Sequence, residues 1–121
     1  MNICITSTGD SLNSEVDPRF GRCQYFIIVN PKTLEFEAVE NATISATGGA
    51  GVVSGQFVAA KNVTAVLTGN VGPNVFQTLE AADVKIITGV SGTIKEVIER
   101  YNSNGFAGTT DPTVESHAGM K

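Results

Sequence analysis

The sequence is poor in the residues from which metal sites and nucleic-acid surfaces are built. Its 121 residues include two cysteines and one histidine. There is no CxxC or HxxxH pair, so a closed structural zinc site is not expected. Lys and Arg total 8 against 12 Asp and Glu, for a net charge of −4. This balance argues against a nucleic-acid partner, because binding to phosphates requires cations clustered on one face.

Long apolar runs are also missing. No stretch approaches membrane-spanning length, and the chain opens on Asn2-Ile-Cys-Ile-Thr6 without a basic segment followed by a long apolar one. We therefore expect no signal peptide, no membrane contact, a cytoplasmic location and cysteines that stay reduced. A hydrophobic fraction of 41% with 17% charged residues is ordinary for one globular domain of this length.

The sequence does contain a regular succession of strand and helix patterns. These predict strands at 3–5, 25–29, 34–40, 63–67 and 84–88, and helices at 52–60, 73–82 and 94–101. The last helix is expected to begin with a capping box at Thr93-Ile-Lys-Glu96, and its apolar residues Ile94, Val97, Ile98 and Tyr101 recur at helical spacing. The turn at Asn30-Pro31-Lys32 makes the second and third strands an antiparallel hairpin. The order βββαβαβα with two parallel crossovers predicts an α/β fold of the ribonuclease H-like type, a five-stranded mixed sheet with helices on its faces. One domain is expected over 1–101, with a loosely ordered tail over 102–121.

The segment from Val66 to Phe76, in which a strand is followed by a turn and a helix, is the central feature of the predicted fold. It is typical of a buried strand, a tight turn and a helix. Gly69 and Gly72 are expected to supply backbone freedom where the chain reverses. Pro73 suits the first helical position, because the missing N–H has no acceptor there anyway. The free N–H groups at the start of the helix would then point into the turn, which predicts an anion-binding site there.

A second candidate site is the loop at 17–23, which carries two cations, an aromatic residue and a thiol. Arg19 and Arg22 would favour the thiolate of Cys23, which could then bind a soft metal or a cluster. The alternative is that Cys23 simply caps the second strand. The arginines could likewise be ion-pair partners for Glu15 and Asp17, or forks for an anionic ligand.

The remaining candidates are weaker. Cys4 lies between two isoleucines and is expected to be a small buried hydrophobe. His117, in the predicted tail, is either solvated or a mobile ligand that closes over a bound cluster. The glycines at 48–51 invite a dinucleotide interpretation, but Gly55 comes one place late for that motif. Nuclease chemistry would need carboxylates beginning on the first strand, which has none.

Three motifs in this order resemble the dinitrogenase iron–molybdenum cofactor biosynthesis family. They are Asp17-Pro-Arg-Phe-Gly-Arg22, Gly48-Gly-Ala-Gly51 and Thr68-Gly-Asn-Val-Gly-Pro-Asn-Val-Phe76, and the likeness runs from Asn2 to about Tyr101. That family comprises small carrier domains that accompany nitrogenase cofactor assembly, together with stand-alone relatives. The resemblance implies the same ribonuclease H-like fold that the strand order predicts.

The resemblance also implies a function, namely binding or transfer of an iron–sulfur or iron–molybdenum type cluster without a catalysed reaction. Cofactor donor or acceptor proteins would be its partners. By matching position, the pocket wall comprises Arg19, Phe20, Gly21, Arg22, Gly49, Gly51, Gly69, Gly72 and Asn74. Cys23 and His117 are candidate metal ligands only. The alternative is a non-catalytic binding or regulatory module for a small anion or a protein; a hydrolase is a weaker one. The oligomeric state is left open.

Overall fold

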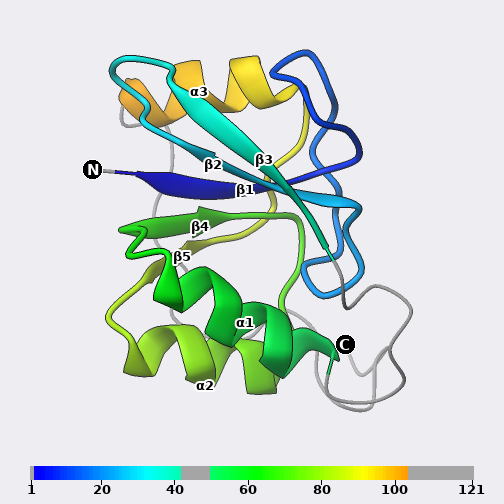
Figure 1. Ribbon diagram of the computed structural model, residues 1–121, viewed down its shortest axis with the longest axis vertical. Helices are drawn as coiled ribbons and strands as arrows, with labels where there is room; N and C mark the ends of the chain where they lie inside the picture. The colour runs from blue at the N-terminus through cyan, green and yellow to red at the C-terminus, as the bar shows by residue number, and fades with distance from the viewer. Residues whose placement is uncertain (1, 42–49, 104–121) are drawn as a thin grey trace.

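The computed structural model describes residues 2–41 and 50–103. The elements follow one another as β1 (Ile3–Ser7), β2 (Tyr25–Val29), β3 (Phe36–Glu40), α1 (Ala50–Ala60), β4 (Ala65–Leu67), α2 (Pro73–Ala81), β5 (Lys85–Ile87) and α3 (Ile94–Asn102). Together they form one layered unit in which helices cover a sheet (Figure 1). The predicted α/β class is confirmed.

The sheet has five strands in the spatial order β3-β2-β1-β4-β5. β2 runs antiparallel to both β1 and β3, whereas β4 runs parallel to β1 and to β5. The sheet is therefore mixed, as expected, and β3 forms one of its edges. Because β1, β3, β4 and β5 all run in the same direction, their C-terminal ends lie at one end of the sheet, near Ser7, Glu40 and Leu67.

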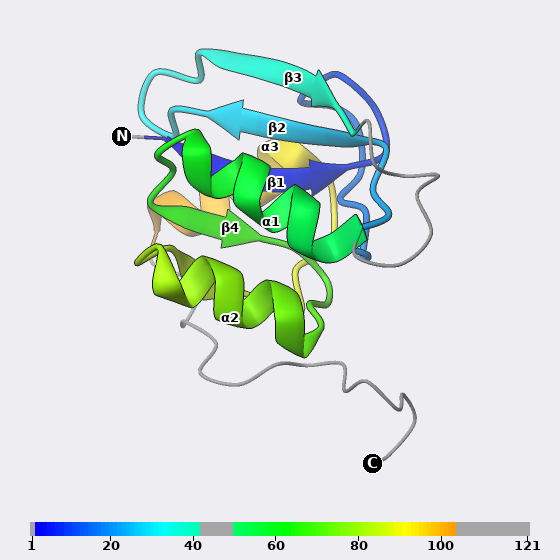
Figure 2. The ribbon, with the colours of Figure 1, turned by 60° about the horizontal axis from the view of Figure 1, so that its bottom comes forward.

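Helices lie on both faces of the sheet. α1 and α2 cover one face and α3 covers the other (Figures 1 and 2). Alternate residues of each strand point to opposite faces, so the two faces have separate cores. Cys4, Phe26, Ile28 and Val66 pack with residues of α1 and α2 such as Leu79. The second core forms under α3, and its members include Ile3, Ile5, Ile27, Leu67, Val97 and Ile98.

Local sequence explains where the helices begin. Pro73 is the first residue of α2, as predicted. Thr93 caps α3 through a reciprocal capping box, in which its side chain accepts from the N–H of Glu96 at 3.2 Å and its own N–H donates to the Glu96 carboxylate at 2.9 Å. The β2–β3 hairpin is likewise confirmed, and its turn is held by Asn30 Oδ1, which accepts from the N–H groups of Lys32 and Thr33.

Element ends differ slightly from the predicted ones. β3 begins at Phe36 rather than at 34, because Leu34 has a φ of 67° and belongs to the turn. β4 and β5 are both three residues long and shorter than predicted. α3 continues to Asn102, whose side-chain amide donates to the carbonyl of Pro31 at 2.8 Å. The last helical turn therefore extends one residue past the predicted domain boundary at 101.

Candidate functional site

The loop at 17–23, called the arginine loop below, is anchored by a buried carboxylate. The side chain of Asp17 is 4% exposed. It accepts a hydrogen bond from the backbone N–H of Arg19 at 3.0 Å, and its Oδ1 lies 3.5 Å from Arg19 Nε. An Asp whose side chain bonds the backbone two residues on is the chemistry of a tight turn. The ion-pair interpretation of Arg19 is thus confirmed, although 65% of the arginine side chain remains exposed.

The same loop is fastened to the end of β1. The N–H of Asp17 donates to the carbonyl of Thr6 at 2.9 Å. The hydroxyl of Thr6 in turn donates to the carbonyl of Asp17 at 2.7 Å and lies 2.8 Å from the hydroxyl of Thr68. Both threonines are fully buried. The hydroxyls of Thr6 in β1 and Thr68, directly after β4, therefore form a pair that holds the arginine loop at the C-terminal ends of these strands.

The arginine loop lies directly against the turn that joins β4 to α2. The N–H of Phe20 donates to the carbonyl of Asn70 at 3.4 Å, and Asn70 Nδ2 donates to the carbonyl of Pro18 at the same distance. Arg19 and Asn70 form a short parallel bridge. The structure thus brings together two of the three sequence motifs, 17–22 and 68–76, although about 50 residues separate them in the chain.

Gly69 has a different role from the expected one. Its φ is not positive, since the positive-φ glycines of the described chain are Gly89 and Gly92. A Cβ on Gly69 would instead lie 2.6 Å from Pro18 Cα and 2.8 Å from the Pro18 carbonyl oxygen. Gly72 is also extended, with φ −84° and ψ 172°. Neither glycine therefore uses the backbone freedom that the sequence predicted; Gly69 is required instead by the close approach of the arginine loop.

The N-terminus of α2 lies at the same end of the sheet as the arginine loop. Its N-cap, Gly72, provides no side-chain hydrogen bond. The first N–H groups of any helix lack acceptors within the helix, and they carry the positive end of its dipole. Asn74, in this first turn, is exposed. The first turn of α1, which includes Gly51, lies at the same end of the molecule (Figure 2).

Cys23 is not the reactive thiolate that its two neighbouring arginines suggested. It is fully buried, and burial, reinforced by the nearby carboxylate of Asp17, raises the pKa of the Cys23 thiol from 9.0 to about 12. The expected direction of the shift is therefore wrong, because desolvation outweighs any effect of the exposed arginines. Cys4 is buried as predicted, and burial likewise raises the pKa of its thiol.

The other predicted residues are placed as follows. Phe20 is 2% exposed and its ring centroid lies 5.5 Å from that of Phe26, so it belongs to the core under α1 and α2. Arg22 is exposed and Gly21 is half-buried. Gly49 and His117 lie outside the described residues. The pocket wall proposed from the sequence is thus only partly a surface: Arg19, Arg22 and Asn74 are exposed, whereas Phe20 is buried.

Asn41 is the residue that the sequence-based prediction missed. It is 3% exposed, and its side-chain amide donates to the carbonyls of Cys23 at 2.9 Å and Gly21 at 3.3 Å. It therefore clamps the end of the arginine loop to the end of β3, immediately before the segment that holds the glycine motif. The only available signal was a polar residue directly after a predicted strand, and that signal is too common to select it.

The described residues offer no ready-made metal centre. No group of three or more His, Cys, Asp or Glu side chains in that part of the chain could hold a metal ion. Over the same residues, no helix is both long and apolar enough to cross a membrane. The fold and the arginine loop define a small α/β domain whose candidate site is a cationic loop docked against a strand–turn–helix joint.

Comparison with known proteins identifies the family of this domain. The chain belongs to the family described as dinitrogenase iron–molybdenum cofactor, which matches residues 1–104. The apo form of the orange protein from Desulfovibrio gigas is similar in structure, with a TM-score of 0.89 and 34% identity over 93% of this chain and 95% of that one. A putative NifB protein from Thermotoga matches with a TM-score of 0.78, also at 34% identity, over 93% of this chain and 97% of that one.

A curated relative is more distant. An uncharacterized protein of Methanocaldococcus jannaschii is 27% identical over 92 residues, which cover 74% of this chain and 78% of the relative. The family resemblance predicted from the three sequence motifs is confirmed by the family match.

Proposed function

We propose that this protein is a non-catalytic carrier that binds an iron–sulfur or iron–molybdenum type cluster and exchanges it with donor or acceptor proteins in cofactor assembly. Membership of the dinitrogenase iron–molybdenum cofactor family supports the cargo class. The observation that carries the proposal is the docking of the arginine loop against the β4–α2 turn, with hydrogen bonds between Phe20 and Asn70 and between Asn70 and Pro18.

The chemistry of this surface suits an anionic cluster. Guanidinium groups offer planar forks of N–H donors to sulfide or oxide acceptors. The uncapped N-terminus of α2 adds backbone donors and a positive partial charge. Asp17, the first residue of the loop, is buried and contacts Arg19 Nε at 3.5 Å. It therefore orients the Arg19 side chain, 65% of which remains exposed to solvent. Arg19 and Arg22 would then bind the cargo, with Asn74, Gly72 and the glycines Gly49 and Gly51 lining the seat.

Direct ligation of a metal by Cys23 would require two changes in the folded protein. Cys23 would have to lose a proton that burial retains, with a pKa of about 12, and its side chain would have to reach the surface. We therefore propose that the arginines and backbone amides hold the cargo by charge and hydrogen bonding. Under this proposal Cys23 supports the loop, and His117 is left as a candidate ligand. Weak attachment of this kind suits a carrier that must release what it binds.

The experiment is an anaerobic titration with a synthetic thiolate-ligated [4Fe–4S] dianion and, separately, with extracted iron–molybdenum cofactor, followed by absorbance and by metal retained after gel filtration. We expect Arg19→Ala with Arg22→Ala to lower retention at least about tenfold. The matched control is Lys32→Ala with Lys85→Ala, which removes the same charge from elsewhere and should retain the parent's uptake. Equal uptake by both double variants would disprove the site, and no uptake by the parent would disprove the function.

A Cys23→Ala variant separates the two modes of attachment. If the cargo is held by charge, this variant should bind as the parent does, with an unchanged absorption spectrum. Loss of a sulfur-to-metal charge-transfer band in Cys23→Ala, with normal folding by circular dichroism, would instead assign Cys23 as a ligand and contradict attachment by the arginines alone.

The same arginines suit a metal-free anion, which is the alternative function of a regulatory binding module. The two buried cysteines favour this alternative, because a thiol that keeps its proton does not bind a metal. Thermal-shift measurements with phosphate and with nucleotides test it. Stabilisation of the parent by either one, lost in the double arginine variant and without cluster uptake, would select the regulatory module over the carrier.

We also infer that the topology is ribonuclease H-like and that the protein acts in the cytoplasm. The first inference is supported by the strand order β3-β2-β1-β4-β5 with antiparallel β1, β2 and β3. The second is supported by two free cysteines among the described residues and by the role of the family in cofactor assembly.

A further inference from the structure

The outer edge of β3 has no strand partner in the part of the chain that the structure describes. Within the described residues β3 pairs with β2 alone, and no element lies beyond it in Figure 2. The N–H of Asn30 donates to the carbonyl of Glu35, and the N–H of Asn41 donates to that of Gln24. Since alternate residues of an antiparallel pair exchange these bonds, odd-numbered residues of β3 bond to β2. The N–H and C=O groups of Phe36, Ala38 and Glu40 therefore face outward.

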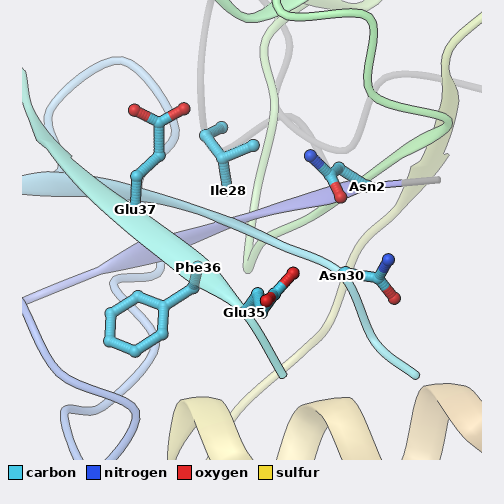
Figure 3. Close-up of a pocket in the computed structure, with 6 residues that line it drawn as sticks. All are labelled: Asn2, Ile28, Asn30, Glu35, Phe36 and Glu37. Carbon is cyan, nitrogen blue, oxygen red and sulfur yellow. The ribbon is translucent and has the colours of Figure 1, made fainter. Parts of the chain in front are cut away.

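The side chains along this edge have a distinct pattern. Leu34 and Phe36, each 42% exposed, are two of the three exposed large hydrophobic residues in the described chain. Phe36 projects away from Glu37 across the strand, next to a shallow hollow at the start of β3 (Figure 3). Its other lining residues come from the start of the chain, β2, the β2–β3 turn and β3; they are Asn2, Ile28, Asn30, Glu35 and Glu37. An exposed edge with apolar side chains of this kind is a template for strand pairing.

Charge decides which kind of strand could pair there. Glu35, Glu37 and Glu40 are all exposed, and the cation that contacts them in the described structure is Lys61, whose Nζ lies 3.4 Å from Glu37. A second copy of β3 would bring the same acidic set against this one, and like charges across a strand pair are destabilising. The edge therefore repels copies of this chain and is complementary to a basic strand.

We propose that the open edge of β3 is a docking site for an extended, basic segment of a partner protein, which adds as a further strand to the sheet. Main-chain hydrogen bonds to Phe36, Ala38 and Glu40 would provide affinity, as in other strand-addition complexes. Glu35 and Glu37 lie on one face of β3, so Lys or Arg on the matching face of the partner would pair with them. An apolar residue on the opposite face would pack on Phe36.

This proposal is independent of the cargo. The start of β3, where Phe36 and the hollow lie, is at the opposite end of the sheet from Ser7 and the arginine loop, because β3 runs parallel to β1. A cargo-binding failure would therefore leave the docking site untouched, and a docking failure would leave cargo uptake unchanged.

The test uses the full chain and a short capped peptide in which lysine alternates with threonine or valine. We expect binding by isothermal titration, weakened by added salt, and protection of the amides of Phe36, Ala38 and Glu40 from hydrogen exchange in the bound state. The same peptide with glutamate in place of lysine should not bind. Binding without protection at these amides would overturn the proposal, because the peptide would then lie elsewhere.

Charge reversal provides the matched variants. Glu35→Lys with Glu37→Lys, the two acidic residues on the face assigned to the partner's cations, should weaken the basic peptide at least about tenfold. Glu80→Lys with Glu99→Lys makes the same change in net charge on exposed faces of α2 and α3 and should leave affinity within about twofold of the parent. Equal weakening in both pairs would mean that only net charge matters. A parent that instead dimerises with protection of the same amides would show that a second copy occupies the edge.

Discussion

At the residue scale, the docking of the arginine loop depends on a missing side chain. Pro18 crosses Gly69 so closely that a Cβ there would lie 2.6 Å from Pro18 Cα. That distance is below any normal carbon contact, and both sides of it are backbone or ring atoms with little freedom to move. Gly69 is thus required because the segment around Pro18 packs against it, and not because of the conformation of its own turn.

Gly69→Ala should therefore lower the free energy of unfolding by about 1–3 kcal/mol, the range for forced overpacking. Urea unfolding followed by circular dichroism measures it. Asn70→Ala is the control, because it loses one long hydrogen bond of 3.4 Å and adds no atom near Pro18. A Gly69→Ala protein that unfolds at the parent's midpoint would mean that the loop can shift without cost.

Cys23 provides a second prediction at this scale, from the sign of its pKa shift. The folded thiol keeps its proton up to about pH 12, whereas the ordinary value is 9.0. Between these values the unfolded chain binds fewer protons than the native one, so stability falls as pH rises, by up to about 1.4 kcal/mol per pH unit. Below pH 9 this group contributes no pH dependence.

Cys23→Ala should remove that contribution. Its absolute stability will be lower because a small cavity is left, but the slope of stability against pH between 9 and 11 should be shallower than in the parent. Urea midpoints over this pH range measure the slope, and Ser11→Ala, an exchange outside the core, serves as the control. Identical slopes for Cys23→Ala and the parent would contradict a raised pKa.

At the scale of elements, the helix termini differ in a way that matches their proposed roles. α3 has a complete capping box, formed by Thr93 and Glu96. α2 begins at Pro73 after Gly72, with no side-chain cap. A capped N-terminus uses its N–H groups for stability, whereas an uncapped one leaves them for solvent or a ligand. The uncapped helix is the one beside the arginine loop.

Removing the α3 cap should cost stability. We expect Thr93→Ala to lower the free energy of unfolding by about 1 kcal/mol, because the hydroxyl that accepts from the Glu96 N–H is lost. Thermal or urea unfolding checks this. Thr78→Ala on α2 is the matched control, since its hydroxyl only bonds back to the carbonyl of Asn74 at 2.9 Å and alanine is a better helix former. Equal losses in both variants would argue against a capping role.

At the scale of the whole molecule, the described residues form a hydrophobic core on each face of the sheet. The core under α1 and α2 runs from Cys4 to Ile86, and the core under α3 runs from Ile3 to Ile98. Among the described residues, the last side-chain hydrogen bond to a distant segment is that of Asn102 with Pro31. Stability should therefore reside in the segment up to this bond, because buried apolar area supplies most of the free energy of folding.

A chain ending after Ser103 should consequently unfold within about 0.5 kcal/mol of the full chain, the usual range for changes outside the core. A chain ending after Tyr101 should be less stable, because it loses the bond from Asn102 and the helix C-cap at Ser103. Urea unfolding of the three chains checks the order. A large loss on ending at Ser103 would show that residues beyond it contribute to the fold.

Much of the fold could be predicted from the sequence because its signals are local. The alternation at 34–40 and the spacing of Ile94, Val97 and Ile98 reflect the periods of strand and helix. The lengths of β4 and β5 were overestimated mainly because a buried apolar residue, Val63 or Val84, lies shortly before the first residue of each strand. The site was harder to predict: the sequence left Cys23 either as a thiolate favoured by two arginines or as the cap of the second strand, and only the packing around it shows a buried thiol.

The sequence by itself determined the order of strands and helices, the hairpin at Asn30, the start of α2 at Pro73 and the cap of α3, since each depends on residues a few positions apart. Only the tertiary structure decided that Pro18 lies on Gly69, that Asn41 clamps Gly21 and Cys23, and that Phe20 is core. These contacts join segments far apart in the chain, and the free energy of burial that selects them depends on which segments meet and not on local pattern.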